Sequence, residues 1–112
     1  YCENDNEAIG AIMALEAAGF TVGSDILHGE VMVLSFDGIN EEALGYAKEG
    51  KIACIGECNP MHGARVAGMI EQIENGESIN KFNYVEERIF SALPDVTEIT
   101  VDDTTYSITV PE

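Results

Sequence analysis

Polar side chains that could bind a small hydroxylated molecule stand at three places where strands are predicted to end. Asn4 follows the opening residues, Asp37 follows one apolar run, and Glu57 with Cys58 follows a second. A carboxylate accepts from two neighbouring hydroxyls and an amide both donates and accepts, so these groups suit a neutral polyol. Spacing alone also fits a simpler interpretation, in which Asn4 is a helix cap and Asp37 is a turn residue.

A catalytic reading of the same region depends on Cys58 and His62, which lie four residues apart. A nucleophile–base pair also needs an orienting group and an oxyanion site, and the sequence marks neither. The cysteines do not follow a zinc spacing, and no calcium loop or Gly-x-Gly-x-x-Gly pattern is present. We therefore predict no catalytic residue, no metal site and no cofactor.

An α/β scaffold is predicted to bring these residues together. Three helices should begin after caps at Asn4, Asn40 and Asn59, the last with Pro60 at its first position, and should stop at Gly19, Gly50 and Gly76. Residues 31–36, 52–56 and 82–90 are predicted strands, and the continuous apolar run at 31–36 indicates a strand buried on both faces. Residues 96–101 and 105–110 alternate about a turn at 102–104, which predicts a hairpin. Alternating helices and strands imply a parallel sheet, and ligands bind beyond the carboxyl ends of such strands.

Charge excludes one class of partner. The 112-residue chain has 21 acidic and 5 basic residues, a formal charge of −16, which excludes nucleic-acid binding through phosphate neutralisation. It also argues against docking on an anionic membrane. Apolar residues make up 46% of the chain, enough to build a core, and the length suits one domain. The three cysteines are an odd number, and their disulfide state stays open.

Several motifs, in order along the chain, resemble type 1 periplasmic binding proteins of the sugar-binding branch. Residues 4–19 read NDNEAIGAIMALEAAG, similar to the family's NDxxAxGAxxALxxAG helix. Residues 33–38, VLSFDG, resemble its VVGFDG strand and turn, and residues 50–53, GKIA, resemble the entry to its next strand. Asn59-Pro60 with Gly63, followed by Gly76-Glu77, resembles a further family pattern.

The resemblance implies a fold of two α/β lobes with the solute held between them. This chain would be a C-terminal fragment containing a partial parallel-sheet, three-layer lobe and a C-terminal β-hairpin. Residues 1–57 would be part of the C-terminal ligand-binding lobe, residues 58–81 would cross to the N-terminal lobe, and residues 82–112 would return with the hairpin tail. Exposed apolar faces of the fragment would then bind the missing N-terminal lobe or another copy of the fragment.

The resemblance also implies a function and site residues. Asn4 matches the family's sugar-binding Asn and Asp37 its ligand-binding Asp. Cys58 stands where the family commonly has Gln, a bidentate amide that a thiol cannot replace, so either Glu57 would compensate or the ligand would differ. The implied protein is a non-enzymatic, extracytoplasmic solute-binding component of an ABC importer, periplasmic or extracellular, with a lipid anchor as one option. It would deliver a sugar to the importer's permease. The alternative is the effector-binding domain of a LacI-type transcription regulator.

Overall fold

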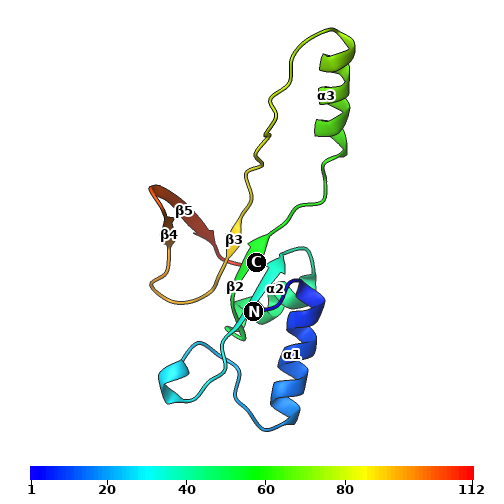
Figure 1. Cartoon of the computed structure of the whole chain (residues 1–112). Helices are drawn as coiled ribbons and strands as arrows, with labels where there is room; N and C mark the ends of the chain where they lie inside the picture. The colour runs from blue at the N-terminus through cyan, green and yellow to red at the C-terminus, as the bar shows by residue number, and fades with distance from the viewer.

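The computed structural model describes residues 1–112 as an elongated α/β chain measuring 60 × 29 × 23 Å (Figure 1). The elements, in order, are α1 (Asp5–Ala17), a short 3₁₀ helix (Ile26–His28), β1 (Val33–Asp37), α2 (Glu41–Lys48), β2 (Ile52–Glu57), α3 (Gly63–Glu74), β3 (Ile89–Phe90), β4 (Glu98–Val101) and β5 (Thr104–Thr109). The predicted α/β class is confirmed.

Two of the three predicted helix starts are confirmed by their caps. The Asn4 side chain accepts from the Glu7 N–H at 2.9 Å, and the Asn40 side chain accepts from the Glu42 N–H at 2.9 Å. The third prediction is wrong by three residues, because α3 begins at Gly63 and not at residue 60. The Asn59 side chain accepts from the Met61 N–H, which makes a turn that leads the chain out of the sheet before the helix forms.

The five strands form one sheet in the order β1-β2-β3-β5-β4. β1 and β2 are parallel, as predicted, and their register pairs Asp37 with Glu57. The predicted strand at 82–90 is only Ile89–Phe90, and it runs antiparallel to β2. Figure 1 shows the reason: the chain leaves the end of β2 towards α3 and returns from the same side, so the returning strand must run in the opposite direction.

The hairpin prediction is confirmed. β4 and β5 pair antiparallel from Val101 and Thr104 outwards. Asp102, in the turn between them, has a positive φ of 52°, which Asp tolerates better than most residues. The hairpin joins the rest of the sheet through a short parallel pairing of β5 with β3.

The core lies between the two N-terminal helices and one face of the sheet. Ala8 and Ile12 of α1, Ala43 and Ala47 of α2, and Ile55 of β2 are fully buried in one cluster. Both helices therefore cover the same face, and this chain supplies two of the three layers expected of the lobe.

The prediction that the strand at 31–36 is buried on both faces is wrong within this chain. Leu34 and Phe36 of β1 are 36% and 38% exposed, whereas Val33 and Ser35 are buried. α3 stands apart at the far end of the molecule, and none of its residues is buried (Figure 1). None of the helices combines the length and the apolar character needed to cross a membrane.

Candidate functional site

Asn4 and Asp37 line one hollow at the carboxyl end of β1. The hollow has a volume of about 240 Å³ and is lined by Asn4, Asp5, Asn6, Asp37, Ile39 and Asn40. The start of α1 supplies half of this set, and the β1–α2 connection supplies the other half. The structure thus brings together two residues that are 33 positions apart, at the edge where parallel sheets bind ligands.

Two polar groups that line the hollow make no hydrogen bond within the protein. The Asn4 carbonyl oxygen caps α1, but its amide nitrogen makes no hydrogen bond within the chain. The Asp37 carboxylate makes none either, and this residue is half-buried at the rim of the hollow. The helix-cap interpretation of Asn4 is correct, and the cap leaves a free donor on the same hollow as a free acceptor. This is the pairing that a polyol needs.

The backbone around Asp37 is unusual. Its φ is 110°, a conformation that non-glycine residues rarely adopt and that is often found at ligand sites. Gly38 follows with a φ of 67°, and a Cβ at this position would lie 3.0 Å from the Phe90 ring. The Asp37 carbonyl also accepts from the Cys58 N–H at 2.8 Å, which ties the end of β1 to the residue after β2. Sheet pairing on one side and Gly38 on the other therefore fix the backbone at Asp37.

Asp5 is the residue that orders the hollow. Its carboxylate is 2% exposed and accepts from the Ser35 hydroxyl, the Ile39 N–H and the Asn40 N–H, each at 3.0 Å. These bonds fasten the β1–α2 connection to the first turn of α1. The Asn40 amide also donates to Asn6 at 3.0 Å. The sequence interpretation missed Asp5, although Ser35, a polar residue within an apolar strand, was the available signal.

Glu57 lies next to Asp37 in the sheet but its carboxylate is engaged elsewhere. It is 7% exposed and accepts from the Arg88 backbone N–H at 2.8 Å and from the guanidinium at 3.0 and 2.6 Å. The hydrogen bonds from the Arg88 side chain hold the pKa of Glu57 below its usual value of 4.5. Glu57 does not line the hollow, and its role as a ligand-binding residue stays a prediction.

Cys58 is close to the hollow through its backbone but does not line it. Its thiol makes no hydrogen bond, and the nearby His62 ring pairs with the Arg65 guanidinium at 3.1 Å instead. A binding role for Cys58 likewise stays a prediction. Elsewhere, no group of three or more His, Cys, Asp or Glu side chains is close enough together to hold a metal ion.

Comparisons with known proteins find similarity to sugar-binding proteins. The chain is 28% identical over 92 residues to the fructose import binding protein FruE of Bifidobacterium longum, a match that covers 82% of this chain and 26% of the relative. No protein-family model matches the chain.

Two solved structures extend the likeness to three dimensions. A Mycobacterium smegmatis protein in complex with β-D-fucofuranose superposes with a TM-score of 0.64 at 26% identity, covering 83% of this chain and 31% of that one. An ABC transporter periplasmic solute-binding protein of Actinobacillus succinogenes with bound D-allose superposes with a TM-score of 0.57 at 33% identity. The match covers 77% of this chain and 28% of that one. The resemblance to sugar-binding solute-binding proteins is confirmed. This chain spans about a quarter to a third of the length of these proteins.

Proposed function

We propose that this chain supplies one half of the sugar site of an ABC importer's solute-binding protein. The free NH₂ group of Asn4 and the free Asp37 carboxylate share one hollow, and this observation carries the proposal. In the solved relatives the ligands are a fucofuranose and D-allose, and the curated relative is named for fructose. A monosaccharide with vicinal hydroxyls matches one carboxylate beside one amide.

The shape of the chain supports a division between two lobes. Residues 1–57 and 82–112 would belong to the lobe that holds the hollow, and residues 58–81 would belong to the facing lobe. α3 lies in the middle segment and is reached by two long connections (Figure 1). Val66, Ile70 and Ile73 lie on it at helical spacing and are about half exposed, as expected of a surface that packs on another lobe.

Ligand binding would then close the two lobes about the two connections that join them. A sugar that contacts both lobes favours the closed form, because those contacts exist only there. The closed protein would deliver its sugar to the importer's permease outside the cytoplasmic membrane, either free or held by a lipid anchor. No chemical step is required of the site, so the proposed role is not enzymatic. The LacI-type alternative shares the fold, but the named relatives are import proteins, which favours the importer.

Isothermal titration calorimetry on the complete two-lobed protein tests the proposal, with D-fructose, D-allose and D-fucose as ligands. Asp37→Ala should weaken the best ligand by about 1.5–3 kcal/mol, the contribution of hydrogen bonds to a charged group. Asp103→Ala, at the exposed hairpin turn, is the matched control and should leave the affinity unchanged. Equal affinities for wild type and Asp37→Ala, or equal losses in both variants, would contradict the proposal.

A further inference from the structure

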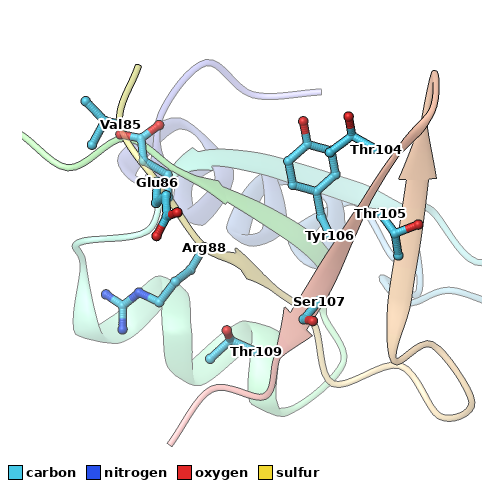
Figure 2. Close-up of a pocket in the computed structure, with 9 residues that line it drawn as sticks. Val85, Glu86, Arg88, Thr104, Thr105, Tyr106, Ser107 and Thr109 are labelled. Atoms are coloured by element: carbon cyan, nitrogen blue, oxygen red, sulfur yellow. The ribbon is translucent and has the colours of Figure 1, made fainter. Parts of the chain in front are cut away.

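The largest hollow of the molecule lies away from the sugar site, between the chain leading into β3 and the strand β5. It has a volume of about 550 Å³. Figure 2 shows Val85, Glu86 and Arg88 on one side, and Thr104, Thr105, Tyr106 and Ser107 on the β5 side. Only two of its nine lining residues are hydrophobic, so it does not resemble a pocket for an apolar ligand.

The two walls of this groove continue an existing β-ladder. β3 and β5 pair in parallel at Ile89 with Ile108 and at Phe90 with Thr109, and the pairing stops there. Extending the same register backwards pairs Arg88 with Ser107, Glu87 with Tyr106, Glu86 with Thr105, and Val85 with Thr104. These eight residues are, with Thr109, the complete lining of the groove.

Backbone groups on both walls point into the groove. The Ile108 N–H donates to the Thr97 C=O at 2.9 Å, so the backbone N–H and C=O groups of even-numbered β5 residues point towards β4. Alternation along the strand turns the N–H and C=O of Thr105 to the groove side. On the other wall, the Arg88 C=O accepts from the Glu57 N–H at 2.9 Å, so Glu87 presents its backbone groups to the groove. The backbone N–H and C=O of Glu87 make no hydrogen bond within the chain.

We propose that the two walls of the groove can pair with each other, which extends the β3–β5 ladder back to residue 85 and closes the groove. The observed arrangement is the open form. The observed bond from the Ser91 N–H to the Thr109 C=O sets the pattern. The equivalent bond four residues earlier on both strands would run from the Glu87 N–H to the Thr105 C=O. The Thr105 N–H would then donate to the Val85 C=O. Closure satisfies backbone groups that otherwise depend on water.

The hairpin is the side that moves. Arg88 is fixed by Glu57, and the Glu87 side chain accepts from the Asn59 N–H at 2.9 Å, so residues 85–88 are fastened to the end of β2. β4 and β5 are attached to the sheet mainly through the short pairing with β3. Closure would brace the connection between α3 and the sheet, and so couple the position of α3 to that of the hairpin.

Disulfide trapping tests the closed register in a chain whose three native cysteines are replaced by alanine. Residues directly paired in a parallel ladder lie about 4.8 Å apart, within the range that a disulfide bridges. Glu86→Cys/Thr105→Cys should therefore oxidise at least about tenfold faster than Glu86→Cys/Tyr106→Cys, whose side chains leave the ladder on opposite faces. Thr100→Cys/Thr105→Cys reports on the folded hairpin, because these residues are paired and their hydroxyls lie 3.0 Å apart.

Four outcomes decide the proposal. Fast intrachain oxidation of the 86/105 pair, together with the 100/105 pair, supports closure in the stated register. Oxidation of the 100/105 pair without the 86/105 pair overturns it, because the hairpin is then folded but does not close. Failure of the 100/105 pair to oxidise overturns it as well, because β5, one wall of the groove, is then not formed. An equal rate for 86/105 and 86/106 would also contradict the register.

Discussion

Removing the Asp5 carboxylate should cost more stability than any other single change at the hollow. Asp5→Ala leaves the Ser35 hydroxyl and the N–H groups of Ile39 and Asn40 without their acceptor. Each hydrogen bond to a charged group contributes about 1.5–3 kcal/mol, but these three share one carboxylate and water can reach the rim. We therefore expect a total loss of about 3 kcal/mol, a large part of the stability of a small domain.

Asp5→Asn separates hydrogen bonding from packing. Its amide oxygen can still accept from both backbone N–H groups, and its NH₂ can donate to the Ser35 hydroxyl, so the expected loss is about 1 kcal/mol. Asn6→Ala is the matched control on the same turn, because it removes one exposed bond to Asn40 and should cost less than about 1 kcal/mol. Urea unfolding followed by circular dichroism measures all three. The reasoning is refuted if Asp5→Ala costs no more than Asn6→Ala, or if Asp5→Asn costs as much as Asp5→Ala.

Three further predictions concern other parts of the chain. Gly38→Ala should cost about 1 kcal/mol more than Gly19→Ala in the same urea assay, since both have positive φ but only the Gly38 Cβ would meet an aromatic ring, at 3.0 Å; equal losses would be inconsistent with this. The Glu57 pKa is lowered in the folded chain, so its stabilising contribution is present above the unfolded value of 4.5 and is lost as pH falls through the lower folded value. Arg88→Gln should therefore have a lower free energy of unfolding than wild type near neutral pH, and this difference should shrink at acid pH. A difference independent of pH would count against this. The chain should self-associate through α3 in sedimentation experiments, more strongly at high salt because its −16 charge is then screened; Ile70→Glu should reduce association, and a monomer under all conditions would exclude it.

Local patterns predicted most of the fold because their causes are local. The caps at Asn4 and Asn40 depend on backbone groups two or three residues away, so residue type and spacing are sufficient. The apolar runs around Val33 and Ile55 predicted two strands in the correct order. The hairpin followed from alternation about a turn.

The errors concern features set by distant parts of the chain. The direction of β3 depends on α3 standing outside the sheet, which no local pattern encodes. The exposure of Leu34 and Phe36 depends on which sheet face the helices cover.

The same limit applies at the site. Asp5 accepts hydrogen bonds from residues 30 to 35 positions away, and Glu57 from a residue 31 positions away. Sequence spacing therefore could not predict these contacts. Asn4 and Asp37 were predicted to lie at one edge because each was placed at a predicted strand end, and the structure brings both to one hollow.

Chemical-shift mapping by NMR is the most direct test of Asn4 and Asp37 as one half of a sugar site. The ¹⁵N-labelled 112-residue chain would be titrated with D-fructose, D-allose and D-fucose. We expect weak binding, with Kd of about 1 mM or higher, because one lobe supplies only part of the contacts. The shifts should be confined to residues 4–6 and 37–40. Shifts centred elsewhere, or none with any sugar, would contradict the account.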